Sequence, residues 1–122
     1  MKKSRKNIIC LEKIDFYCSE ISKILASHQY NKEYFEHSSE MQYACSMCII
    51  QIGELITIMD DEFKNDYTEI PWRQIKGARN VYVHQYGEID LDEMWNTLIY
   101  SIPDLESKIT EILRKSQDET GV

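Results

Sequence analysis

The stretch MQYACSMCIIQIGELITIM, residues 41–59, decides the fold of this chain. Its apolar residues recur every three or four positions, an interval that gathers them on one side of an α-helix. This stripe consists of Met41, Ala44, Cys45, Cys48, Ile49, Ile52, Leu55, Ile56 and Met59. Polar residues interrupt the stretch, so it is not the run of about 18 apolar residues that spans a membrane. We therefore predict a long helix over residues 34–59 that lies in a protein core.

Gly53 stands inside this predicted helix, with no proline nearby to end it. A glycine in a helix interior costs about 1 kcal/mol relative to alanine. We expect its small size to allow a second helix to approach closely.

The same periodicity appears on both sides of the long helix. Residues 7–27 carry a stripe of Ile, Leu, Tyr and Cys, which predicts a first helix. After a polar loop over residues 60–69, Pro71 opens a third helix, because proline is tolerated in the first helical turn. Gly87 is expected to end that helix in the left-handed conformation.

A fourth helix is predicted to begin after Asp90, with Glu93 three residues later in the arrangement of a capping box. Its apolar stripe continues to Leu113. Pro103 is expected to kink this helix or to divide it into two stacked pieces.

These elements together predict one all-α domain over residues 1–122, with frayed ends at residues 1–6 and 116–122. Only four glycines and two prolines are present, and no strand pattern stands out. The fold is predicted to be an antiparallel bundle of four main helices, or five segments if the last one is divided.

Cysteine usage and the start of the chain indicate a cytoplasmic protein. Basic residues open the chain, but charges return at Glu12 and Asp15, so no signal-peptide apolar segment follows. Among the four cysteines, Cys45 and Cys48 share one face of the long helix. We interpret them as small core residues and not as a redox pair or zinc ligands. No metal site and no cofactor are predicted.

The charge of the chain is unevenly distributed. The net charge is −7, which argues against a general nucleic-acid binder. Residues 71–87 nevertheless contain no acid and carry Arg73, Lys76 and Arg79. A basic patch on an acidic body fits one confined anion site, although ordinary unevenness of charge would give the same pattern.

The end of the predicted third helix, ARNVYVHQYG at residues 78–87, crowds reactive polar groups together. Asn80 and His84 are four apart and lie side by side on a helix. Arg79 and His84 are five apart, about 140° around the axis, so on an ideal helix they cannot both point straight at one spot. The long reach of arginine and the looser geometry near the helix end at Gly87 would relax this restriction. A second copy of the chain, related by a two-fold axis, would let residues of two chains line one cleft.

Histidine and arginine together are sufficient for cleavage of RNA without a metal ion. The imidazole of His84 can take the 2′-hydroxyl proton, and the guanidinium of Arg79 can stabilise the charge on the phosphate. A dimer would supply a second histidine as the acid for the leaving oxygen. The structural alternative is that His84 interacts with the helix dipole and Arg79 with an acid across the bundle.

The motif and its surroundings resemble the HepT-like branch of the HEPN superfamily, the toxins of HepT–MntA toxin–antitoxin pairs. The signature R-N-x3-H-x-Y is matched by Arg79, Asn80, His84 and Tyr86. The resemblance covers roughly residues 7–113 and includes three further landmarks in the same order. They are the segment IQIGEL at 50–55, Pro71-Trp72 before the motif, and the acid-capped helix with Trp95 after it.

This resemblance implies a homodimeric, metal-independent endoribonuclease with Arg79 and His84 as catalytic residues. It also implies an MntA-like nucleotidyltransferase antitoxin that transfers AMP from ATP to Tyr86. We expect Asn80 to support the site by orienting the imidazole, or to have only a surface or capping role. Arg73 and Lys76 are expected to contact RNA phosphates. The alternative function is a non-cleaving domain that binds RNA or a nucleotide beside a nucleotidyltransferase.

Overall fold

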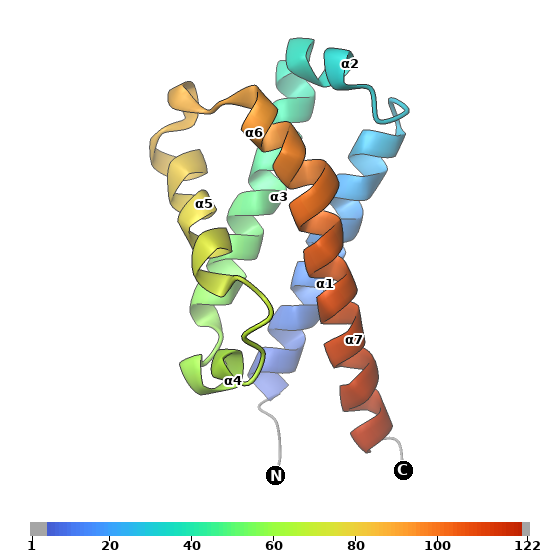
Figure 1. Cartoon of the computed structure of the whole chain (residues 1–122), viewed down its shortest axis with the longest axis vertical. Helices are drawn as coiled ribbons and strands as arrows, with labels where there is room; N and C mark the ends of the chain where they lie inside the picture. The colour runs from blue at the N-terminus through green and yellow to red at the C-terminus, as the bar shows by residue number, and fades with distance from the viewer. Residues whose placement is uncertain (1–4, 121–122) are drawn as a thin grey trace.

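The computed structural model describes the backbone of residues 5–120 and the side chains of residues 5–117. It is an antiparallel helical bundle (Figure 1), and no residue of the described range lies in a strand, so the predicted fold class is confirmed. Residues 1–4 and 121–122 lie outside the described range, and for them the expectation of frayed ends stays a prediction. Within the range, α1 (Arg5–Ala26) begins at Arg5 and α7 (Ile102–Thr120) ends at Thr120.

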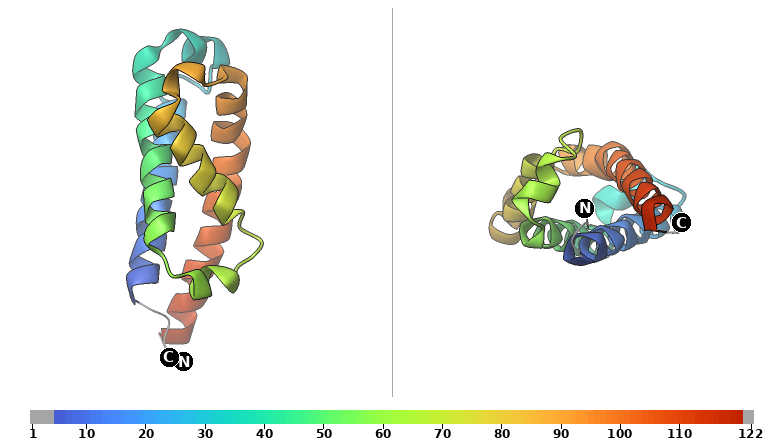
Figure 2. Two further views of the ribbon diagram at one scale, coloured as in Figure 1. Left: turned by 90° about the vertical axis from the view of Figure 1, so that its left-hand side faces the viewer. Right: turned by 90° about the horizontal axis from the view of Figure 1, so that it is seen from below.

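The helix α3 (Ser39–Ile58) is the centre of the bundle, because it packs against α1 on one side and α5 (Trp72–His84) on the other. The helix α7 packs against α1, and α1 begins at the end of the bundle where α7 ends (Figure 2). The predicted stripe of α3 is buried, except Ala44, which is half-buried. This stripe meets a similar row on α1: Asn7, Leu11, Ile14, Cys18, Ile21 and Leu25.

The prediction of one helix over residues 34–59 is wrong at its beginning. The chain forms a short helix α2 (Lys32–His37), then breaks at Ser38, whose backbone is extended. The Ser38 side chain accepts a hydrogen bond from the Met41 backbone N–H at 3.1 Å. A serine that caps a helix in this way ends the previous element, because its backbone must leave helical geometry.

The segment predicted as a polar loop contains a short helix, α4 (Asp61–Asn65). Phe63 is its one buried residue, and a single apolar residue gives no periodic signal in the sequence. The Trp72 indole N–H donates to the Lys64 and Tyr67 carbonyl oxygens at 3.1 Å each, which fastens this segment to the start of α5.

Helix α5 ends at His84, before the predicted stop at Gly87. Gly87 lies in the 3₁₀ turn η1 (Tyr86–Glu88), and no glycine of the described chain has a positive φ. The Glu88 N–H donates to the Gln85 carbonyl at 2.9 Å, so tight turn bonds replace the left-handed cap that was expected.

The last long helix is continuous through a wide turn. Asp90 caps α6 (Leu91–Asn96) as predicted, since its side chain accepts from the Asp92 and Glu93 backbone N–H groups. The π-helical turn η2 (Thr97–Ser101) then joins α6 to α7. In place of a kink or division at Pro103, the helix has this π-helical turn just before the proline. Proline has no backbone N–H to donate to a regular helix.

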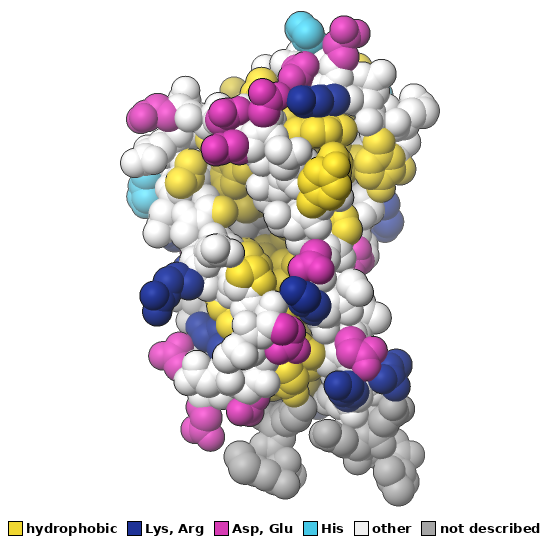
Figure 3. Space-filling view, viewed as in Figure 1, with side chains coloured by type: hydrophobic (Ala, Val, Ile, Leu, Met, Phe, Trp, Pro, Cys, Tyr) yellow, Lys and Arg dark blue, Asp and Glu magenta, His cyan; other side chains and the backbone are white. Residues whose placement is uncertain are grey.

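By length and apolar composition, α3 would also pass for a membrane-crossing helix. About half of the relevant window is buried inside the bundle, and its contacts with α1 and α5 are those of a core helix. On its other side, α5 borders an apolar hollow of about 240 Å³ towards η2 and α7, and hydrophobic side chains show between these helices in Figure 3. Helix α5 therefore rests mainly on α3, so α3 determines where the α5 side chains lie.

Candidate active site

Arg79 lies where α5 crosses α3 most closely. A Cβ atom placed on Gly53 of α3 would overlap the Cβ and Cγ atoms of Arg79. The expectation that Gly53 allows close helix approach is therefore confirmed. The stem of Arg79 lies over this glycine, and 27% of the side chain remains exposed.

An ion pair and a hydrogen bond hold the guanidinium of Arg79. Its Nε lies 2.5 Å from the Oε1 atom of Glu54, the residue that follows Gly53 on α3. The Nε–H does not point along a hydrogen bond to that oxygen, so the contact is an ion pair without ideal hydrogen-bond geometry. The Nη1 atom donates to the Asn80 Oδ1 at 2.8 Å. The alternative that Arg79 pairs with an acid across the bundle is therefore confirmed. The sequence did not identify Glu54 as that acid, since the contact joins residues 25 positions apart.

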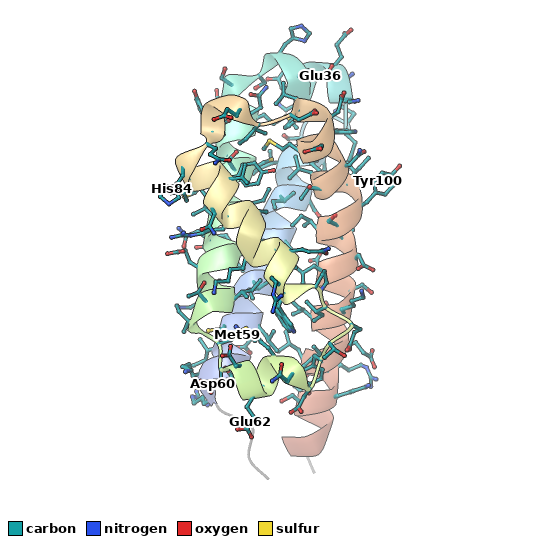
Figure 4. All side chains as sticks on the ribbon, turned by 60° about the vertical axis from the view of Figure 1, so that its left-hand side comes forward. Glu36, Met59, Asp60, Glu62, His84 and Tyr100 are labelled. Carbon is teal, nitrogen blue, oxygen red and sulfur yellow. The ribbon has the colours of Figure 1, made fainter. Side chains whose placement is uncertain are left out.

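His84 is the last residue of α5 and is exposed. Figure 4 shows its ring pointing away from the bundle into solvent. The imidazole of His84 makes no hydrogen bond or ion pair with any residue in the described part of the chain. Within one chain, Arg79 faces α3 while His84 faces solvent, as their spacing on the helix required. No contact in the monomer brings the two residues together.

Asn80 is exposed, and its amide oxygen accepts the hydrogen bond from Arg79. It makes no hydrogen bond to His84 in the described part of the chain. The structure therefore links Asn80 to the arginine of the motif, whereas the sequence had suggested a link to the imidazole.

Tyr86 follows α5 in the η1 turn and is half-buried. Its ring lies 5.4 Å from the ring of Tyr43 on α3, measured between centroids. Tyr82, one turn earlier, is buried in the core. Burial is the main cause that raises the pKa of Tyr82 to about 12, with the neighbouring Tyr86 as a smaller contribution.

Arg73 and Lys76 project from the first turns of α5 and are exposed. Neither forms an ion pair with any described residue. Together with Lys64 they border a hollow of about 590 Å³ between α4 and α5, in which Asp61 is the one acid. This end of α5 thus carries unpaired positive charge on a chain whose net charge is −7.

The outer face of α3, beside Arg79, carries exposed apolar side chains. Tyr43, Met47 and Ile58 are exposed by 60%, 55% and 52%, and Ile50 between them is half-buried. Glu54 falls in the same row, because the positions 43, 47, 50, 54 and 58 repeat every three or four residues. We call this row the outer stripe of α3. The sequence already contained the spacing of this outer stripe, because apolar residues fall on two sides of α3.

The four cysteines are buried and free, which confirms the interpretation of Cys45 and Cys48 as core residues. Burial raises the pKa of Cys45 to about 12 and that of Cys48 to about 11. Thiols with such pKa values carry almost no thiolate near neutral pH and are poor nucleophiles and metal ligands. Between residues 5 and 117, no group of three or more His, Cys, Asp or Glu side chains is arranged to hold a metal ion.

Comparison with known proteins gives a consistent set of relatives. The sequence model of the family "Ribonuclease HepT-like" matches residues 11–112. The chain is 34% identical over 83 residues to "Probable ribonuclease HepT" of Thermococcus cleftensis, a match that covers 68% of this chain and 74% of that protein. It is 26% identical over 108 residues to "Putative RNase MJ1216" of Methanocaldococcus jannaschii, covering 87% and 88%.

A third relative is "Putative RNase TTE0752" of Caldanaerobacter subterraneus, 33% identical over 66 residues. This match covers 54% of the present chain and 59% of that protein. No solved structure gives a significant match.

Proposed function

This chain belongs to the HepT-like ribonuclease family, and we propose that it is the toxin of a HEPN–nucleotidyltransferase toxin–antitoxin pair. Its activity is metal-independent cleavage of RNA in the cytoplasm. The observation that supports this most is the state of the motif on α5. His84 is exposed and unpaired among described residues, and Arg79, five residues earlier on the same helix, is held at the surface by Glu54.

The reaction follows from these two side chains. The neutral imidazole of His84 removes the proton from the ribose 2′-hydroxyl. The 2′-oxygen attacks the adjacent phosphorus, and the bond from phosphorus to the 5′-oxygen breaks. Arg79 donates to the phosphate oxygens as negative charge accumulates on them. The products are a 2′,3′-cyclic phosphate and a 5′-hydroxyl end, with a proton supplied to the leaving 5′-oxygen.

A dimer completes this chemistry in two ways. The second histidine, from the partner copy, provides the acid that protonates the leaving oxygen. A second copy also allows an arginine and a histidine that diverge on one helix to face the same phosphate across an interface. The outer stripe of α3 offers the apolar surface for such an interface; Glu54 lies within this stripe, and Arg79 lies beside it.

RNA would reach this site along α5. Arg73 and Lys76 stand about 12 to 17 Å from His84 along the helix axis, given a rise of 1.5 Å per residue. Their unpaired charges at the hollow beside α4 can contact phosphates of nucleotides next to the cleaved bond. Such contacts would add affinity without selecting a base sequence.

The antitoxin partner would act on Tyr86. The phenolic oxygen attacks the α-phosphorus of ATP and pyrophosphate leaves, so Tyr86 gains an AMP group. An anionic group at this position would compete with RNA for Arg79 and obstruct the cleft. The half-buried ring keeps Tyr86 in place against Tyr43.

The cleavage activity is tested with purified, unmodified protein and single-stranded RNA in the presence of a chelator. We expect cyclic-phosphate products from the wild type, and a loss of rate of about 100-fold or more in His84→Ala and in Arg79→Ala. His37→Ala is the matched control, because His37 is also an exposed histidine in the last turn of a helix.

Full activity in both α5 variants, with their helical content retained, would remove the proposed site. RNA binding by the wild type without any cleavage would instead favour the non-cleaving binding domain.

A further inference from the structure

We propose that Glu54 is a positioning residue for the reaction, acting through Arg79. This inference rests on the proposed function, since it concerns the same arginine. The two consecutive residues Gly53 and Glu54 of α3 determine the location of both ends of the Arg79 side chain. Gly53 receives the aliphatic stem, and Glu54 fixes the charged head.

The contacts of the guanidinium leave one edge available. A guanidinium carries five N–H groups, one on Nε and two on each Nη. Glu54 lies against Nε, and Asn80 accepts from one Nη1–H. Both Nη2–H groups and the second Nη1–H remain for a ligand. Two parallel bonds from the terminal Nη groups are suited to the oxygens of a phosphate.

The carboxylate of Glu54 has opposite effects on binding and on rate. It is 46% exposed and lies close to the phosphate position, so it repels RNA and weakens binding. It also holds the guanidinium in one orientation, so the bonds to the transition state need no further ordering. A residue of this kind raises kcat while it also raises KM.

Asn80 alone cannot provide this orientation. It is exposed and lies next to Arg79 on the same helix, so its single hydrogen bond leaves the arginine free to move with the Asn80 side chain. Glu54 comes from the neighbouring helix, which is the element that supports α5. The contact therefore ties the arginine head to the core of the bundle.

The test is steady-state cleavage of one RNA by Glu54→Ala, Glu54→Gln, Arg79→Ala and the Glu54→Ala/Arg79→Ala double variant. We expect Glu54→Ala to lower kcat by about 10- to 100-fold, the range for a small misplacement of a reacting group. RNA binding should be unchanged or about two- to fivefold tighter at low salt, because one negative charge is removed. Glu54→Gln removes the charge of the ion pair and should lower kcat in the same direction, because the contact with Nε is not an aligned hydrogen bond.

The double variant should be no slower than Arg79→Ala, because Glu54 acts only through that arginine. Glu62→Ala is the control, since Glu62 is an exposed glutamate on α4 that points away from the bundle (Figure 4). It should change neither kcat nor RNA binding.

A Glu54→Ala variant with wild-type kcat would overturn the inference, and so would a double variant that is further slowed below Arg79→Ala. A wild type that cleaves no RNA would count against the proposed function itself. In that case the ¹⁵N–¹H signal of the Arg79 side chain still tests the contact, because its position should change in Glu54→Ala and stay unchanged in Glu62→Ala.

Discussion

Two tyrosines of α5 and the η1 turn, Tyr82 and Tyr86, are four residues apart but have different surroundings. Tyr82 is buried, and burial raises its pKa to about 12. Tyr86 is half-buried, packs at the edge of the core and has a ring contact with Tyr43. A transferase needs access to the phenolic oxygen and a straight approach of the leaving pyrophosphate. In the proposed AMP transfer, we therefore expect Tyr86 and not Tyr82 to be the acceptor.

The acceptor is identified by intact mass after co-expression with a candidate nucleotidyltransferase antitoxin. We expect mass increments of adenylyl size on the wild type, together with loss of toxicity and of RNA cleavage. Tyr86→Phe should abolish the increments, because phenylalanine has no nucleophilic oxygen. Tyr82→Phe is the matched control and should keep them. Increments that persist in Tyr86→Phe would show that another residue is modified.

At the level of elements, apolar spacing gave correct helices wherever a long stripe was present. Apolar periods of three and four predicted α1, the central part of α3, and the continuous helix formed by α6, η2 and α7. The structure differs from the predicted helices where a single residue determines the local backbone. Ser38 breaks a helix by capping the next one, and Phe63 anchors α4 with no second apolar residue to make a pattern.

The end of α5 shows why the stop at Gly87 could not be predicted. Glycine allows the left-handed conformation but does not require it. The hydrogen bonds from Glu88 to Gln85 and from Ile89 to Tyr86 instead satisfy the chain by a 3₁₀ turn. Whether the chain forms a 3₁₀ turn or a left-handed cap depends on where the following helix α6 begins, and the packing of the bundle determines that position.

The contact between α3 and α5 gives a prediction for Gly53→Ala. Alanine is favoured over glycine in a helix by about 1 kcal/mol. Here its Cβ would overlap the Cβ and Cγ of Arg79, and these atoms cannot move without α5. Overpacking of this kind costs about 1–3 kcal/mol, which exceeds or offsets the gain from alanine, so we expect a net loss of stability of up to about 2 kcal/mol in urea unfolding.

Gly77→Ala is the matched control for this prediction. Gly77 lies inside α5, and a Cβ there meets no atom within 4 Å. The substitution should leave stability unchanged or raise it by up to about 1 kcal/mol. If Gly53→Ala is as stable as Gly77→Ala, the close approach of the two helices is not what the glycine provides.

At the scale of the whole molecule, the sequence supplied the residues of the site but not their assembly. The spacing of Arg79 and His84 already required them to diverge on one helix, and the structure places one against α3 and the other in solvent. The sequence allowed for an ion pair of Arg79 with an acid across the bundle, but it did not identify Glu54 as that acid, because the pairing depends on how α3 and α5 cross. In the proposed dimer, a second copy that docks on the outer stripe of α3 would bring an arginine and a histidine of different chains together.

The dimer is tested by a charge in the centre of the outer stripe. Met47→Lys places an ammonium where a two-fold interface would bury it, so we expect a monomer in sedimentation measurements and loss of RNA cleavage, with the helical content retained. Phe16→Lys is the matched control, because Phe16 on α1 is also 55% exposed but lies outside the stripe. It should remain dimeric and active. A Met47→Lys variant that stays dimeric would place the interface elsewhere, and an active monomer would show that one chain positions both Arg79 and His84 at the phosphate.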